Sequence, residues 1–89
     1  MFSKRIEQGE NKYLQVEICY DKGSYSTKRR YYIYIYPFEI EKIGGFEFVS
    51  RDILAGRYRL LKEVNRKSKK AEQEAKTIAR EHYPEYFAS

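Results

Sequence analysis

The segment Arg29–Pro37 constrains the fold more than any other part of the chain, and it has the sequence Arg-Arg-Tyr-Tyr-Ile-Tyr-Ile-Tyr-Pro. Its alternation predicts a β-strand over residues 29–36, because successive side chains of a strand point to opposite faces. One face would carry Tyr31, Ile33 and Ile35, and the other would carry Tyr32, Tyr34 and Tyr36. When one face of a strand is buried, the other face commonly carries polar side chains. Three interpretations of the tyrosine face therefore stay open: a nucleic-acid-binding surface, an interface with a partner, or β-propensity alone.

Two more strands are predicted on either side of this segment. Residues 13–20 alternate apolar and polar side chains, and residues 46–49 form a short run after the turn Gly44-Gly45. Residues 21–28 are rich in turn formers and predict a flexible loop. Ile35 and Phe38 are three positions apart, so one apolar face would need a bulge, which Pro37 favours. For the turn at 43–45 we favour a three-residue loop over a two-residue Gly-Gly loop.

Residues 57–82 are predicted to form one long helix, preceded by a short turn over 51–55 and ended by Pro84. Its inward stripe would be Leu61, Val64, Ser68, Ala71, Ala75, Ile78 and His82. Such a helix would be about 39 Å long, against about 26 Å for an eight-residue strand. Its second half would therefore overhang the sheet. We favour an exposed, frayed end there over a homodimer contact through Ala71, Ala75 and Ile78.

These elements predict an α+β domain: a three-stranded antiparallel β-meander packed on one face by a long C-terminal α-helix. The whole chain, 1–89, would be a single domain. Residues 1–12 would be flexible, 13–50 would form the sheet, 51–83 would be helical and 84–89 would be a tail.

The net charge of +5 is concentrated in one block of the sequence. Residues 51–70 carry eight basic and two acidic side chains, which indicates either a footprint for a polyanion or a solvated helix face. No apolar run approaches the ~20 residues of a transmembrane helix, and the first residues lack the apolar stretch of a secretory signal. Cys19 has no second cysteine to pair with. We therefore expect no membrane partner and a reducing, cytoplasmic location.

No group of residues predicts catalysis. One histidine, His82, and one cysteine, Cys19, lie far apart in the sequence and cannot form a zinc site. No glycine-rich phosphate loop is present, since Gly44-Gly45 is a turn. We therefore expect a protein that is not an enzyme and that has no cofactor or metal.

The residues that favour binding fall into two groups, which we expect on different sides of the domain. The first would place aromatic and basic side chains on the open sheet face, where tyrosines can stack on bases and cations can contact phosphates: Lys22, Lys28, Arg29, Arg30, Tyr32, Tyr34 and Tyr36. The second would be a basic ridge on the long helix: Arg59, Lys62, Arg66, Lys69 and Lys70. The alternative for the tyrosines is simple pairing with cross-strand neighbours such as Gln15, Glu17 and Val49.

Two resemblances bear on this choice. A three-stranded sheet with a Tyr-Tyr-x-Tyr-Ile-like strand, followed by a Lys-Lys-Ala-Glu-x-Glu-Ala helix, resembles the arm-type DNA-binding domains at the N-termini of tyrosine recombinases. That resemblance is topological and covers residues 13–80; it implies a sheet laid in the DNA major groove. The pattern Tyr20-Asp21-Lys22-Gly23, Arg30-Tyr31-Tyr32, Pro37, Leu60-Leu61-Lys62-Glu63-Val64 and 66–72 is similar to small uncharacterised proteins of bacterial mobile elements. That family transfers no activity, but it favours a nucleic-acid context.

The sequence thus predicts a small non-enzymatic protein that binds DNA or RNA through an aromatic sheet face and basic side chains. The alternative is a protein–protein interaction or dimerisation module.

Overall fold

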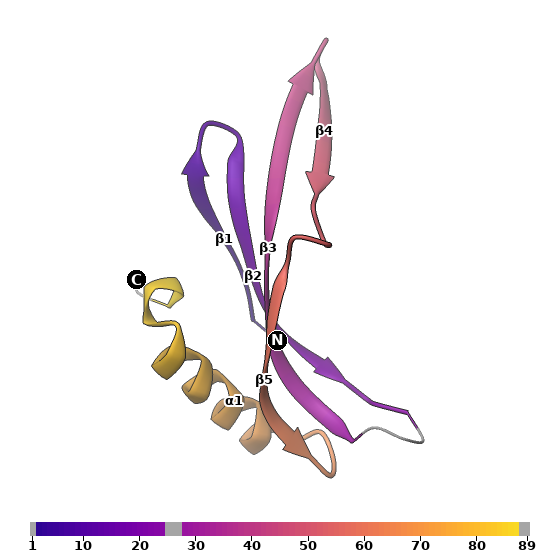
Figure 1. Cartoon of the computed structure of the whole chain (residues 1–89), viewed down its shortest axis with the longest axis vertical. Coiled ribbons are helices and arrows are strands. Elements are labelled where there is room, and N and C mark those ends of the chain that lie inside the picture. Colours follow the sequence, from indigo (N-terminus) through magenta and orange to yellow (C-terminus); the bar gives the residue numbers. More distant parts are fainter. Residues whose placement is uncertain (1, 25–27, 88–89) are drawn as a thin grey trace.

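A computed structural model describes residues 2–24 and 28–87. Within these residues the chain forms five strands and one α-helix, followed by a 3₁₀ turn (Figure 1). The elements are β1 (Phe2–Gly9), β2 (Lys12–Asp21), β3 (Arg29–Ile43), β4 (Phe46–Arg51), β5 (Arg57–Val64), α1 (Lys69–His82) and η1 (Pro84–Tyr86). The predicted α+β class, antiparallel sheet and C-terminal helix are confirmed. The three-stranded meander is wrong in the number of strands.

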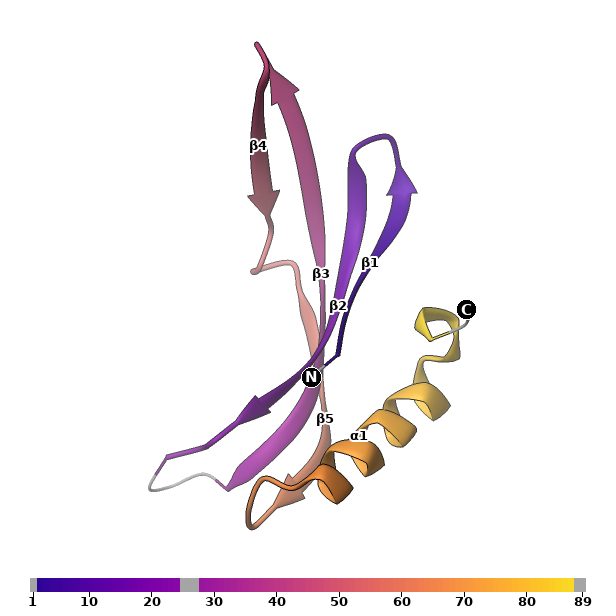
Figure 2. The same cartoon turned by 180° about the vertical axis from the view of Figure 1, so that it is seen from behind.

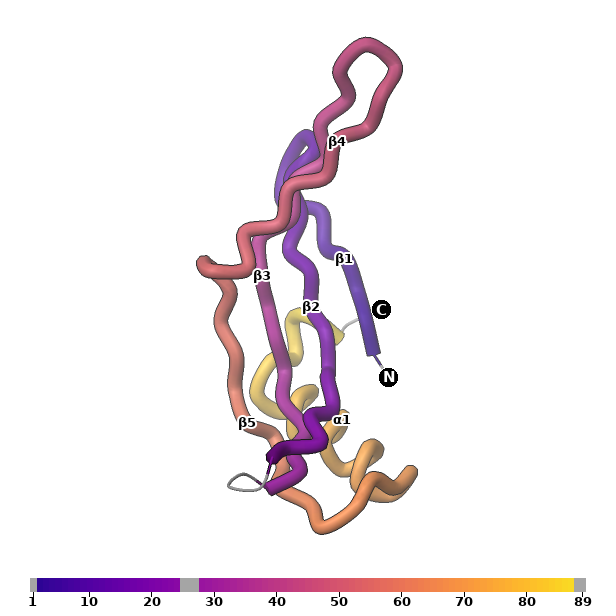
Figure 3. Tube along the Cα trace, turned by 90° about the vertical axis from the view of Figure 1, so that its right-hand side faces the viewer, coloured from indigo at the N-terminus to yellow at the C-terminus, as the bar shows by residue number. Residues whose placement is uncertain are grey.

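The sheet is organised around β3, which is 15 residues long. The strand order is β1-β2-β3-β4, and β5 also pairs with β3. β4 pairs with residues 38–43 of β3, and β5 pairs with residues 29–35, all antiparallel. Because β4 and β5 share one edge of a single long strand, they follow one another along it (Figure 3). The prediction ended this strand at Tyr36, and a strand of that length is too short to pair with both β4 and β5 along one edge.

The first twelve residues were predicted to be flexible, and this is wrong for the described part. Phe2–Gly9 form β1, which pairs with β2 in a regular register from Phe2 opposite Ile18 to Glu7 opposite Tyr13. Phe2 and Ile6 pack against the core. Two apolar residues in eight are too few to predict a strand, but they suffice when β2 supplies the hydrogen-bonding edge.

The chain end was predicted to be a tail, and this also needs correction up to residue 87. Tyr83, Tyr86 and Phe87 pack against the core, and the rings of Phe2 and Phe87 lie 4.8 Å apart. Residue 1, residues 25–27 of the predicted flexible loop, and residues 88–89 lie outside the described part.

The predicted long helix is wrong in its first half, because residues 57–64 form β5. The spacing of Leu60, Leu61 and Val64 suits a helix. Residues 29–35 of β3, however, have a free hydrogen-bonding edge, and this segment pairs with it as a strand. Leu61 points into the core and Leu60 to the other face, as alternation along a strand requires, and the register shift opposite Tyr31 and Tyr32 then brings Lys62 opposite Tyr31, on the helix side.

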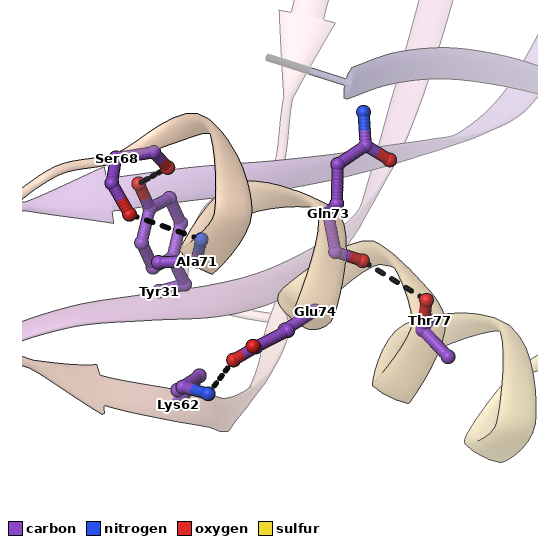
Figure 4. A network of polar contacts seen from close by, with 7 residues as sticks. All are labelled: Tyr31, Lys62, Ser68, Ala71, Gln73, Glu74 and Thr77. Atoms are coloured by element: carbon purple, nitrogen blue, oxygen red, sulfur yellow. Dashed lines mark hydrogen bonds and ion pairs between the residues drawn. The ribbon is translucent and has the colours of Figure 1, made fainter.

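α1 begins at Lys69, directly after its N-cap residue. Ser68 was expected on the inward stripe, but it is the N-cap, and its hydroxyl accepts a hydrogen bond from the Ala71 N–H at 3.1 Å (Figure 4). The Tyr31 hydroxyl donates to the Ser68 carbonyl at 3.5 Å, which ties the cap to the sheet. The helix ends at His82 with Tyr83 as C-cap, next to Pro84.

The expected bulge at Pro37 is absent, because β2 and β3 pair without a shift from Lys12 opposite Glu39 to Asp21 opposite Arg30. The strand instead changes its buried face: Tyr31 and Ile33 are buried on the helix side, while Tyr36 and Phe38 are buried on the other. Pro37 lies where β4 has ended and β5 has not begun. Its missing N–H therefore costs the ladder nothing.

The turn between β3 and β4 is the two-residue form, so the favoured three-residue loop is wrong. Ile43 pairs with Phe46, and Glu41 lies opposite Phe48. Gly44 and Gly45 have φ values of 58° and 83°. Two successive positive φ values define a type I′ turn, which matches the twist of a tight hairpin.

The core lies between the sheet and α1, which crosses one face (Figure 1). It comprises Val16, Ile18, Tyr31, Ile33, Leu61, Ala71, Ala75 and Ala79. Ala75 and Ala79 are fully buried. The small side chains that suggested a dimer contact through Ala71, Ala75 and Ile78 thus let the helix approach its own sheet. A second copy cannot reach Ala71 or Ala75 on this fold.

Within the described residues, α1 is too short and too polar to cross a bilayer.

Candidate functional site

α1 covers one side of the sheet (Figures 1 and 2). Tyr31 and Ile33 pack towards it in the core, so the tyrosine face of β3 lies on the other side, as the alternation predicts. Tyr32 and Tyr34 are half-buried there, opposite Cys19 and Glu17 of β2. Cross-strand pairing with Glu17 and Gln15 is therefore present, as the alternative interpretation expected. Val49, named with them, instead lies opposite Ile40.

Tyr36 differs from its two neighbours, since its side chain is only 6% exposed. Its hydroxyl donates to the Glu17 carboxylate at 3.3 Å. Burial, and then the negative charge of Glu17, raise the pKa of Tyr36 above its ordinary value. Tyr36 therefore supports the face from within and is not a stacking surface, contrary to the sequence prediction.

A pocket of about 290 Å³ opens on this face. Three tyrosines, one leucine and an ion pair line it: Asp21, Arg30, Tyr32, Tyr34, Tyr58 and Leu60. The side chain of Tyr58 is 77% exposed, and Leu60 is 47% exposed. Aromatic and aliphatic surface is thus presented to solvent on both β3 and β5.

One end of the pocket is polar. The guanidinium of Arg30 lies 3.4 Å from the Asp21 carboxylate, whose other oxygen accepts the Gly23 N–H at 2.8 Å. Both side chains of this pair are about half exposed. Burial raises the pKa of Tyr32, and the neighbouring Cys19 adds to that shift. Tyr32 therefore remains a neutral phenol at neutral pH, with donor and acceptor capacity beside the ion pair.

The pocket wall depends on the connection between β4 and β5. The Tyr34 hydroxyl donates to the Ile53 carbonyl at 2.5 Å. A Cβ at Gly56 would lie 2.5–2.8 Å from three atoms of the Tyr34 side chain, the hydroxyl oxygen and two ring carbons. The connection can pass this ring only because position 56 has no side chain. Gly56 thus positions a pocket tyrosine.

A basic end of the molecule adjoins the pocket, because β2, β3, β5 and α1 all begin or end there (Figures 1 and 3). Asp21 pairs with Arg30, and Arg29 pairs with Val64, so the ends of the β2–β3 loop and the β5–α1 turn meet. We call the basic side chains of this end the basic pole: Lys22, Lys28, Arg29, Arg66, Lys67, Lys69 and Lys70. A hollow of about 570 Å³ is lined from both segments.

Positive charge is in excess at the basic pole, because few acidic side chains lie near it. Asp21 pairs with Arg30, and Glu63 lies 4.0 Å from Lys28. The Lys67 ammonium lies 5.2 Å from the centre of the Tyr20 ring. Part of each predicted group therefore lies at this one end of the molecule: Lys22, Lys28 and Arg29 from the first group, and Arg66, Lys69 and Lys70 from the second.

Two predicted members of the helical ridge lie elsewhere, because β5 is a strand. Arg59 and Lys62 lie on the helix side of the sheet, where Arg59 contacts His82 at 3.2 Å. Lys62 forms an ion pair with Glu74 of α1 (Figure 4). Both side chains fasten α1 to β5 and are removed from the pocket.

Three pocket residues escaped the sequence prediction: Asp21, Tyr58 and Leu60. Tyr58 and Leu60 fell in the segment predicted as helix. Their signal is the alternation Arg57-Tyr58-Arg59-Leu60, which fits a strand with an aromatic face. Asp21 was assigned to a loop.

Within residues 2–24 and 28–87, no cluster of three or more histidine, cysteine, aspartate or glutamate side chains could hold a metal ion. No protein-family model matches the chain, and neither a curated protein nor a solved structure matches it. The resemblances to mobile-element proteins and to recombinase arm domains stay predictions.

Proposed function

We propose that this chain is a small non-enzymatic nucleic-acid-binding protein whose pocket stacks an unpaired base while its basic pole contacts phosphates. The observation that carries the proposal is the pocket formed by Tyr32, Tyr34, Tyr58 and Leu60 beside the basic pole. Sheet-borne aromatic side chains with adjacent cations are a common arrangement for single-stranded nucleic acid.

The exposure of Tyr58 supports this assignment. A tyrosine that is 77% exposed contributes little to the core, yet its strand position directs it to the same face as Tyr32 and Tyr34. Base–aromatic stacking is worth about 1–3 kcal/mol per base. At the polar end, the Arg30 guanidinium and the Asp21 carboxylate offer donors and acceptors to a base edge.

The basic pole supplies the second half of the argument. Seven cations at the ends of neighbouring strands and one helix make a concentrated positive field. Phosphate contacts of this kind give affinity that falls steeply with salt. The resemblance to mobile-element proteins favours the same nucleic-acid context.

The test is fluorescence anisotropy with labelled DNA and RNA oligonucleotides, single-stranded and duplex, between ~50 and ~200 mM salt. We expect single strands to bind more tightly than duplexes. Tyr58→Ala should weaken binding at least about fivefold, the equivalent of ~1 kcal/mol. Phe46→Ala is the matched control, because Phe46 is an aromatic residue that is 72% exposed at the far hairpin tip.

Charge is tested separately with a Lys69→Glu and Lys70→Glu double variant, since both side chains are exposed on the first turn of α1. It should lower both the affinity and the slope of log affinity against log salt concentration. The proposal fails if no nucleic acid binds at ~50 mM salt. It also fails if Tyr58→Ala and Phe46→Ala bind equally well.

A protein–protein interaction module is the second candidate. The observation that favours it is the apolar hairpin of β3 and β4, which carries Ile43, Phe46 and Phe48 at exposures of 54–72%.

A further inference from the structure

The hairpin formed by the end of β3 and by β4 projects from the body of the molecule (Figures 1 and 3). Its side chains are unusually apolar for their exposure: Ile43 is 56% exposed, Phe46 72%, Phe48 54% and Val49 50%. Within the described residues, β4 pairs with β3 and with no other strand. β4 is thus an apolar strand with a vacant edge, which invites pairing with another strand.

The register shows which backbone groups face the vacant edge. Ile43 and Phe46 flank the two-residue turn and form a hydrogen-bonded pair. Such pairs alternate along an antiparallel ladder, so Phe46, Phe48 and Ser50 bond to β3. Glu47, Val49 and Arg51 therefore direct their N–H and C=O groups outward.

A second copy of β4 fits this edge in one favoured register. Antiparallel pairing must bring outward residues opposite one another. When the twofold axis passes between the two Val49 residues, all three outward residues are paired. Glu47 then lies opposite Arg51 of the second copy, and Arg51 lies opposite its Glu47. Opposite charges facing one another across strands are favourable.

The neighbouring strand reinforces this register. Lys42 lies opposite Glu47 within the hairpin, and Ile40 lies opposite Val49. Two paired hairpins would present rows of alternating charge, Lys42–Glu47–Arg51, on either side of an apolar row of Ile40 and Val49. A shift of two residues places Glu47 opposite Val49 and leaves fewer residues paired. A shift of four places like charges together.

We propose that a second copy of this chain docks antiparallel along the β4 edge and forms a twofold-symmetric homodimer. The dimer does not depend on nucleic-acid binding. It joins two sheets side by side, so the open faces of both copies become one surface. Six-residue edges make a small interface, below about 1,200 Å², and such interfaces are weak. We expect a dissociation constant of about 0.01–1 mM.

The first test is sedimentation velocity over a concentration series up to ~1 mM, the upper end of the expected range. The wild-type mass should rise from monomer towards dimer. Glu47→Arg and Arg51→Glu should each weaken association at least about tenfold, because each places like charges opposite one another. An equimolar mixture of the two variants should dimerise again, since every cross-strand pair in the mixed dimer is then opposite in charge.

That mixture also controls for folding, because misfolded variants would not recover on mixing. A wild-type mass that stays monomeric throughout the series overturns the proposal. Single variants that associate as well as the wild type overturn it too, as does a mixture that remains monomeric.

The second test locates the axis by disulfide formation, on a Cys19→Ser background under mild oxidation. Paired residues at the axis have Cα atoms about 5.5 Å apart, within the range that a disulfide spans. Val49→Cys should therefore give covalent dimers. Ser50→Cys is the isosteric control, because the two copies of residue 50 lie about 8 Å apart in this register. Equal cross-linking of both variants, or cross-linking of Ser50→Cys alone, refutes the register.

Discussion

Replacing Ala75 by leucine should destabilise the fold by about 1–3 kcal/mol, the usual cost of overpacking. Ala75 is fully buried, and with Ala71 and Ala79 it forms the face of α1 that touches the sheet. Three added carbon atoms have no space there unless the helix lifts away from Ile33 and Leu61. Lifting it would also strain the Lys62–Glu74 ion pair.

The change is large on the scale of this protein. A domain of 89 residues has a total stability of roughly 4–13 kcal/mol. A loss of about 2 kcal/mol should lower the melting temperature by roughly 8–16 °C. Urea unfolding followed by circular dichroism measures it directly, with the m-value unchanged.

Gln73→Leu is the matched control, because Gln73 is exposed on the same helix and its helix propensity is close to that of leucine. It should change the stability by no more than about 0.5 kcal/mol. Equal stability of Ala75→Leu and the wild type would refute a helix docked through its alanines.

Three further predictions concern the cap, the pocket wall and the tyrosine face. Ser68→Ala should cost about 1 kcal/mol in urea unfolding, because the Ala71 N–H loses its acceptor. Gly56→Ala should displace the Tyr34 ring and weaken single-strand binding in anisotropy, while Ala55→Gly should not. Burial raises the pKa of Tyr36 above 10.0, so stability should be full below pH 10 and fall as pH rises through the folded value. Tyr36→Phe should make that alkaline loss shallower by up to about 1.4 kcal/mol per pH unit.

Local pattern was a good guide to the strands that carry strong alternation. The faces of β2 and of the first half of β3 were predicted correctly from residues 13–20 and 29–36, since period-two alternation decides which side chains share a face. The same alternation correctly predicted that Tyr32 and Tyr34 lie on the sheet face away from the helix. The helix was predicted over residues 57–82, and its second half is confirmed as α1, where the apolar side chains keep a helical spacing and no breaker intervenes.

The sequence pattern failed to predict those strands that form only because a neighbouring strand is available to pair with them. Residues 2–9 and 57–64 are individually weak strands, and each forms because an edge of β2 or β3 is vacant beside it. Because residues 57–64 form a strand, Leu60 and Leu61 lie on different faces, and the register shift puts Lys62 opposite Tyr31. No periodicity within 57–64 shows which strand will be next to it.

The sequence by itself determined the tyrosine face, the turn at Gly44-Gly45 and the excess of positive charge, because these follow from nearest-neighbour geometry and composition. Only the tertiary structure decided that Tyr58 joins Tyr32 and Tyr34 in one pocket and that Lys22, Lys28 and Arg29 line one hollow with Val64 and Asn65 of the β5–α1 segment. It also decided that the alanines of α1 face their own sheet. The physical reason is that long-range strand pairing, which local periodicity does not encode, sets which distant residues become neighbours.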